Sequence, residues 1–150
     1  MSDGFLFNQL SEFKQELFRS IQADFPEETN KFLSENAQNF KKQVQKTANR
    51  EVKKGEAKVN YKGKSVNYHK KFKVGKKYKR DESLCIRVYN GARHAHLIEQ
   101  GHVMTDHKGK PLKFVSGKYV FKQAEIEFLP EFEDNVEKFM FEYFDKTTEI

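Results

Sequence analysis

The spacing of the apolar residues changes twice along the chain, and this constrains the fold more than any other sequence feature. Over residues 5–52, apolar side chains recur every three or four positions, as on one face of an α-helix. Over residues 57–88 they recur at every second position, which is typical of half-buried strands. Over residues 119–147 the helical spacing returns. The pattern predicts an α+β fold with N-terminal helices, a small antiparallel sheet, and a C-terminal helix packed on the sheet.

Pro26 divides the first helical region in two, because the residue before a proline avoids the helical conformation. A second helix from Pro26 to about Val52 is roughly 40 Å long. A globule of this chain length has a radius of gyration of only about 15 Å. We therefore expect this helix to bend or to overhang, and an overhanging amphipathic helix needs a neighbouring chain. The length suits one domain over residues 1–150, with helices over 5–52, a sheet and loop over 55–118 and a helix over 119–147.

The middle of the chain contains three runs of alternating residues, at 57–61, 66–74 and 84–88, each predicted to be a strand. Residues 92–101 predict a short helix that Gly101 ends in the left-handed conformation. Residues 101–118 have no firm periodicity. They are either a long functional loop or a hairpin arm in which Val103 and Met104 face Phe114 and Val115.

Charge is segregated along the chain, whose formal net charge is +6. Residues 53–80 hold twelve basic side chains and one acidic one, whereas residues 119–150 hold three lysines and nine acidic side chains. Such opposed segments suit an acidic partner such as nucleic acid, or the assembly of identical copies, or two solvated faces. The candidate contacts to a partner or to DNA are Lys62, Lys64, Lys70, Lys71, Lys73, Lys76, Lys77, Lys79 and Arg80.

Arg80 is the only arginine among residues 53–80, and arginine supplies most specific base contacts. The lysines alternate with aromatic residues that could stack on exposed bases or belong to a core. The segment therefore favours non-specific contact with DNA over sequence-specific binding.

Several classes of protein are not expected. No apolar run approaches the length of a membrane span, and residues 1–4 have no features of a secretory signal. The single cysteine, Cys85, cannot form an internal disulfide, which suits a reducing compartment. The chain has no phosphate-binding loop, dinucleotide-binding turn or metalloprotease motif. We therefore predict no membrane association, no catalytic residues and no cofactor.

Four histidines lie close together in the sequence, His94, His96, His102 and His107, with Glu99 and Asp106 among them. Such groups are ligands for zinc or iron, and a small metal-dependent hydrolase is one interpretation. However, a His-x-His pair on a helix points its rings about 200° apart. We therefore predict no metal site and expect polar or interface histidines instead.

Residues 94–101, His-Ala-His-Leu-Ile-Glu-Gln-Gly, resemble the hallmark segment of a family of phage minor tail components. Proteins of this family act in tail completion or head–tail joining in tailed bacteriophages and prophages. Residues 115–124, Val-Ser-Gly-Lys-Tyr-Val-Phe-Lys-Gln-Ala, resemble the family's second characteristic segment, a Gly-Lys entry into a helix. The resemblance picks out His94, His96, Leu97, Ile98, Glu99, Gly101 and Gly117 as structural residues.

The resemblance implies a structural virion protein of the neck or tail, without catalysis, that is made in the host cytoplasm. Its expected partners are further copies of itself in a six-fold ring, the head connector or stopper, the tail tube or terminator proteins, and DNA in the channel. We expect Gly101 to be critical for the backbone, Leu97 and Ile98 to lie in the core, and Glu99 to hold nearby backbone or a neighbouring subunit. The alternative is a small, basic, non-specific nucleic-acid-binding protein.

Overall fold

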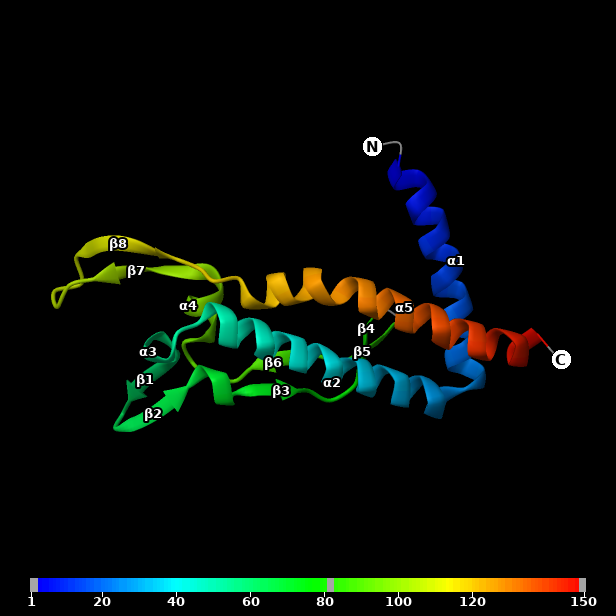
Figure 1. Cartoon of the computed structure of the whole chain (residues 1–150), viewed down its shortest axis with the longest axis horizontal. Coiled ribbons are helices and arrows are strands. Elements are labelled where there is room, and N and C mark those ends of the chain that lie inside the picture. Colours follow the sequence, from blue (N-terminus) through cyan, green and yellow to red (C-terminus); the bar gives the residue numbers. More distant parts are fainter. Residues whose placement is uncertain (1–2, 81–82, 149–150) are drawn as a thin grey trace. The chain divides into compact units, whose positions relative to one another are not determined.

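Helices form both ends of the chain and short strands form its middle (Figure 1). This computed structural model describes residues 3–80 and 83–148, with the backbone only for residues 3–11, 83, 145, 147 and 148. The helices are α1 (Asp3–Asp24), α2 (Pro26–Glu51), α3 (Lys54–Ala57), α4 (Ala95–Gln100) and α5 (Val120–Thr148), with a 3₁₀ turn at Tyr68–Lys70. The strands are β1 (Lys58–Tyr61), β2 (Lys64–Asn67), β3 (Phe72–Val74), β4 (Tyr78–Arg80), β5 (Ser83–Cys85), β6 (Val88–Asn90), β7 (Gly101–Thr105) and β8 (Pro111–Ser116). The predicted α+β fold is confirmed.

The helix boundaries follow the proline and charge signals of the sequence. Helix α1 ends at Asp24 and α2 begins at Pro26, as the proline predicts. Glu27 and Glu28 occupy the first turn of α2, where the helix dipole favours negative charge. Helix α5 is continuous through Pro130. Of the helices in the described ranges, none has the length and apolarity needed to cross a membrane.

The chain forms two units. The terminal unit comprises residues 1–36 and 130–150, and the central unit comprises residues 37–129. Helices α2 and α5 contribute residues to both units. The expectation that residues 1–150 form one domain stays a prediction.

The terminal unit has an aromatic core. Ile21 of α1 and Phe139 and Met140 of α5 are buried in it. Phe32 of α2 stacks on Phe139 with ring centroids 4.4 Å apart, and Phe18 lies 5.9 Å from Phe139. Stacked and tilted ring pairs of this kind add about 0.5–1.5 kcal/mol each beyond their buried area. The helical spacing of these residues in the sequence therefore corresponds to one packed cluster.

The central unit has a second, mostly aliphatic core. Its buried residues come from the end of α2, the start of α5 and the segment between them, and they are Val44, Ala48, Val52, Ala57, Tyr68, Phe72, Val120 and Ala124. Residues four apart on α2 and on α5 supply facing sides, because such positions share one face of a helix. Phe121 of α5 adds a ring 5.9 Å from that of Phe72 in β3. The start of α5 thus packs on the β-rich segment.

The strands form four separate antiparallel pairs: β1–β2, β3–β6, β4–β5 and β7–β8. The single strand predicted over residues 66–74 is wrong, because the 3₁₀ turn divides it. Asn67 accepts a hydrogen bond from the His69 N–H at 3.1 Å, which stabilises this turn, and Tyr68 is turned into the core. The strand predicted over residues 84–88 is also divided, because its two ends pair with different strands, β4 and β3.

Residues 101–116 form a hairpin, which confirms the arm alternative for this segment. The register places Val103 opposite Phe114, as expected, but Met104 is opposite Lys113, and Val115 is opposite His102. We call residues 101–116 the arm. Within the central unit the arm extends outward beyond α4 (Figure 1).

We predict that the buried Tyr68 makes the protein sensitive to alkali. Burial raises the pKa of the Tyr68 hydroxyl above its ordinary value of 10.0, chiefly by desolvating the charged form. Above pH 10 the unfolded chain therefore loses a proton that the folded chain retains, and the free energy of unfolding falls by about 1.4 kcal/mol per pH unit from this group. Chemical denaturation from pH 7 to pH 11 measures this slope.

Tyr68→Phe should remove that part of the slope without lowering stability at pH 7, because the Tyr68 hydroxyl has no hydrogen-bond partner among the described residues. The matched control is Tyr78→Phe at an exposed position. Equal slopes in the wild type and in Tyr68→Phe would contradict the prediction.

Candidate functional site

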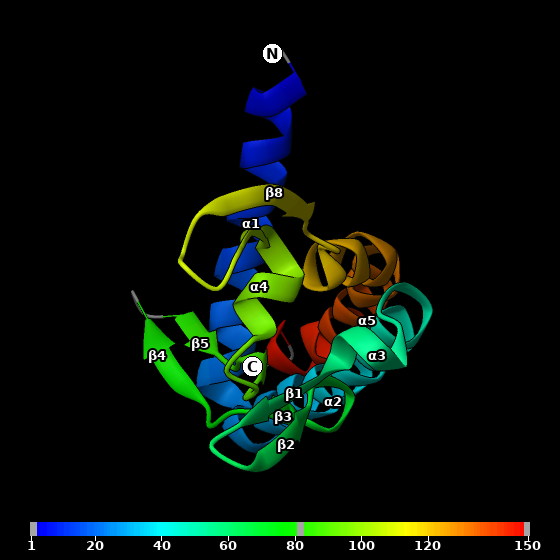
Figure 2. The ribbon, with the colours of Figure 1, turned by 90° about the vertical axis from the view of Figure 1, so that its left-hand side faces the viewer.

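Helix α4, the arm and the first turn of α5 meet at the inner end of the arm. Figures 1 and 2 show α4 leading into β7, and β8 returning to α5 beside α4. We call the residues that make this junction the arm base: Ile98, Glu99, Gly101, Gly117 and Lys118. These positions come from the two segments that the resemblance singled out.

Glu99 caps the N-terminus of α5. Both of its carboxylate oxygens accept hydrogen bonds from the Phe121 N–H, each at 3.1 Å, and Oε1 also accepts from the Lys122 N–H at 3.4 Å. The first N–H groups of a helix have no partner within the helix, and its dipole attracts negative charge. A residue in α4 therefore satisfies the start of a helix that lies beyond the arm.

The backbone closes the same junction from the other side. The Lys118 N–H donates to the Ile98 carbonyl at 2.7 Å, and the Tyr119 N–H donates to the Glu99 carbonyl at 3.1 Å. These carbonyls belong to the last turn of α4, where no intrahelical donor is available. Each end of the arm is thus tied to α4 by hydrogen bonds.

Gly101 and Gly117 allow the two ends of the arm to cross with backbone against backbone. A Cβ at Gly101 would overlap the Val115 carbonyl oxygen and lie 2.7 Å from the Gly117 nitrogen. A Cβ at Gly117 would overlap the Glu99 carbonyl oxygen and lie 2.8 Å from the Gly101 nitrogen. Neither position has room for a side chain.

The conformation of Gly101 differs from the left-handed cap that the sequence predicts. Its φ of 86° is positive, but its ψ of 175° is extended. That region is essentially restricted to glycine. The reason is that Gly101 ends α4 and begins β7 in the same residue, so its ψ must suit a strand.

The histidines lie in different surroundings. His94 is buried, and its Nε2 donates to the Ala57 carbonyl at 2.9 Å, which ties the start of α4 to α3. His96 is exposed on α4, His102 is half-buried in β7, and His107 is exposed at the turn of the arm. Within the described ranges, no three His, Cys, Asp or Glu side chains gather as a metal site would require.

Of the two apolar hallmark residues, Ile98 packs against the core of the central unit. Leu97 is half-buried, and its carbonyl accepts a hydrogen bond from the Gly101 N–H at the end of α4. The hallmark residues therefore serve packing, capping and close backbone approach.

The predicted basic contacts come from several elements, and their role in contacting a partner or DNA stays a prediction. Lys62 and Lys64 flank the β1–β2 turn, and Lys71 and Lys73 lie at β3. Lys76 and Lys77 precede β4, which contains Lys79 and Arg80. Lys70, in the 3₁₀ turn, is the one predicted contact that lines the groove described next.

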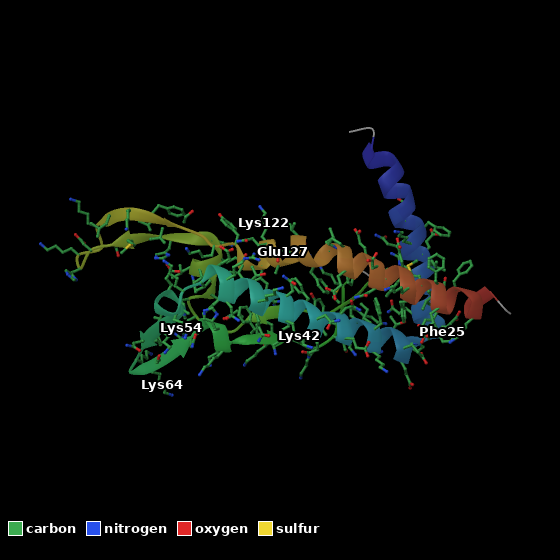
Figure 3. All side chains as sticks on the ribbon, in the orientation of Figure 1. Phe25, Lys42, Lys54, Lys64, Lys122 and Glu127 are labelled. Carbon is green, nitrogen blue, oxygen red and sulfur yellow. The ribbon has the colours of Figure 1, made fainter. Side chains whose placement is uncertain are left out.

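A groove of about 730 Å³ lies in the central unit, lined by the end of α2, α3 and the segment around the 3₁₀ turn. Four lysines line it, Lys53, Lys54, Lys58 and Lys70, together with Asn49, Val52, Asn67 and His69. Figure 3 labels Lys54 in this region. Three of these lysines were not among the predicted contacts, although each lies within the basic segment. The alternating pattern that predicted the strands could not identify these three lysines as neighbours, because they lie around the short helix α3.

His69 is held at the edge of this groove. Its Nε2 donates to the Val52 carbonyl at 3.0 Å. Its Nδ1 is buried and has no partner among the described residues. The hydrogen bond to Val52 fixes the orientation of the His69 ring.

The structure is that of a small α+β protein in which the arm base anchors a projecting hairpin, the arm. A family model, "Bacteriophage HK97-gp10, putative tail-component", matches residues 11–101, which is more than half of the chain. The chain belongs to this family of bacteriophage tail components, as the resemblance implied. No curated protein and no solved structure matches it.

We predict that Glu99→Gln lowers the free energy of unfolding by about 0.3–1 kcal/mol, the usual contribution of a negative charge at a helix N-terminus. The variant keeps the size and hydrogen-bonding oxygen of the side chain but loses the charge and one acceptor at the start of α5. Urea denaturation measures the change. Glu125→Gln, at an exposed position of α5, is the matched control and should change stability by less than about 0.5 kcal/mol. Equal effects of the two substitutions would contradict the capping role.

Proposed function

We propose that this chain is a structural subunit of the phage neck that acts in tail completion or head–tail joining. It works as one subunit of a ring between the head connector and the tail tube. The observation that carries the proposal is the match of residues 11–101 to a tail-component family, together with the use of the hallmark residues to fix a projecting arm.

The arm base supports a structural role. Its residues satisfy backbone groups and allow close backbone approach. A subunit that assembles with copies of itself needs rigid elements that reach a neighbour. An arm anchored at both ends meets this requirement. The absence of catalysis and of a cofactor stays a prediction.

The segregated charge supports a head-to-tail arrangement. A ring built from one kind of subunit needs two different, complementary faces on each copy. The basic segment at residues 53–80 and the acidic segment at residues 119–150 supply opposite charge. The proposed partners are further copies in a ring, expected to be six-fold, with a connector or stopper protein on one side and tail tube or terminator proteins on the other.

We predict that inactivating the gene in its phage or prophage genome leaves filled heads and separate tails, and that supplying the wild-type chain restores joined particles. Electron microscopy of lysates and the infectious titre measure the result. Light scattering of the purified chain should show a closed oligomer, alone or after mixing with the neck proteins. Normal titre and normal particles without the chain would contradict the proposal.

A second candidate, non-specific contact with DNA, is favoured by the lysine-lined groove. Lysine ammonium groups bind phosphates without reading sequence, and their binding weakens steeply with salt. The groove places four of them around one cavity in the central unit. In a neck ring such contact would be made to DNA in the channel.

We predict that replacing Lys53, Lys54 and Lys58 by Gln together weakens binding to duplex DNA of any sequence. The slope of log binding constant against log salt should fall by about 0.9 for each phosphate that the variant no longer neutralises. The control replaces Lys76, Lys77 and Lys79 by Gln, which removes the same charge outside the groove. Fluorescence anisotropy at several salt concentrations measures both. Equal weakening in the two variants would show that net charge alone governs binding.

A further inference from the structure

One face of the arm is apolar and uncovered. Val103 and Phe114 are directly paired and share a face of the hairpin, and Leu112 is the unpaired residue at a register shift of β8, two residues from Phe114. Their exposed fractions are 51%, 64% and 62%. An isolated two-stranded hairpin is marginally stable in water. An exposed apolar face on such an element indicates a partner surface.

The arm base holds this face in a fixed place. Glu99 and the two glycines tie both ends of the arm to α4 and to the start of α5. The ring of Phe114 also reaches toward Gly101, since a Cβ built there would lie 2.9 Å from its Cζ atom. Little conformational freedom would therefore be lost at the arm's inner end on docking, which favours association.

A complementary surface lies on the first turns of α5. Ile126 and Leu129 are three residues apart and therefore share a helix face, and their exposed fractions are 65% and 50%. The opposite side of the same turns carries the buried residues Val120, Ala124 and Phe128. The uncovered apolar surface of the arm thus has a counterpart on α5.

The charges around the two surfaces are opposite. Residues 101–118 contain four lysines and one aspartate, whereas residues 120–129, the part of α5 that belongs to the central unit, contain two glutamates and one lysine. Lys113 is next to Leu112 in β8, and Glu125 is next to Ile126 in α5; both are exposed. Opposite charge around matching apolar surfaces favours one orientation of docking.

The arm cannot reach the α5 surface of its own chain. From the arm base the arm and the first turns of α5 run in opposite directions (Figure 1). Figure 3 shows the same divergence, with Lys122 and Glu127 marking these turns. The complementary surface must therefore come from another molecule.

We propose that the exposed apolar side chains of the arm, Val103, Leu112 and Phe114, in one copy pack on the Ile126–Leu129 face of α5 in the next copy. This contact is head to tail, so it joins copies in series and closes into a ring when the rotation between copies allows it. It deepens the proposed ring role and rests on it. The occupant of the arm's apolar face is a second copy of this chain.

The test is a disulfide cross-link in the double variant Leu112→Cys with Ile126→Cys. After mild oxidation we expect a ladder of covalent multimers on a denaturing gel, because every chain carries both halves of the contact. Peptide mass spectrometry should identify a bond between positions 112 and 126, and this also separates it from bonds that involve Cys85. The matched control is Val59→Cys with Ile126→Cys, whose first position is also exposed but lies on β1.

A second variant keeps the test independent of the cross-link. Leu112→Ser, at an exposed position, should reduce the mass of the assembly toward that of a monomer while circular dichroism and the melting temperature stay unchanged. If the wild type assembles and neither the cross-link nor the reduction in mass appears, the docking contact is wrong and the proposed ring role stands. If the wild type stays monomeric both alone and with the neck proteins, both fail.

Discussion

The cap that the Glu99 carboxylate forms at the N-terminus of α5 is the interaction on which the arm base depends. It joins the end of α4 to the start of α5, although the whole arm separates these helices in the sequence. The hydrogen bonds from Lys118 and Tyr119 and the close crossing of Gly101 with Gly117 can form only when these two helix ends are held together. The cap therefore helps to hold the two ends of the arm together.

The two cores stabilise different parts of the chain. The aromatic core holds α1 to parts of α2 and α5, and the aliphatic core holds the other parts of these two helices to the strands and to the arm base. The two surfaces that we propose for partners, the arm and the lysine-lined groove, belong to the central unit. This arrangement suits a tail component that contacts its neighbours through the central unit, while aromatic packing stabilises the terminal unit.

Much of this architecture could be predicted from the sequence, because periodicity and proline act locally. Pro26 fixed the break between the first two helices, and the hallmark segment led to the arm base. The division of the predicted strands at Tyr68 and at Ile86 could not be predicted, since alternation does not say which partner each half pairs with. The groove was missed for a similar reason: Lys53, Lys54 and Lys58 are neighbours of a helix end, and tertiary folding brings Lys70 to them.

The most direct test of the account is amide hydrogen exchange in the wild type and in Gly117→Ala. A Cβ at Gly117 would push Glu99 and Gly101 apart and would release the arm base. We predict a large, local loss of protection at the amides of Val103, Phe114 and Phe121, while the amides of α1 keep theirs. Unchanged protection of the arm, or an equal loss throughout the chain, would contradict the claim that the arm base positions the arm.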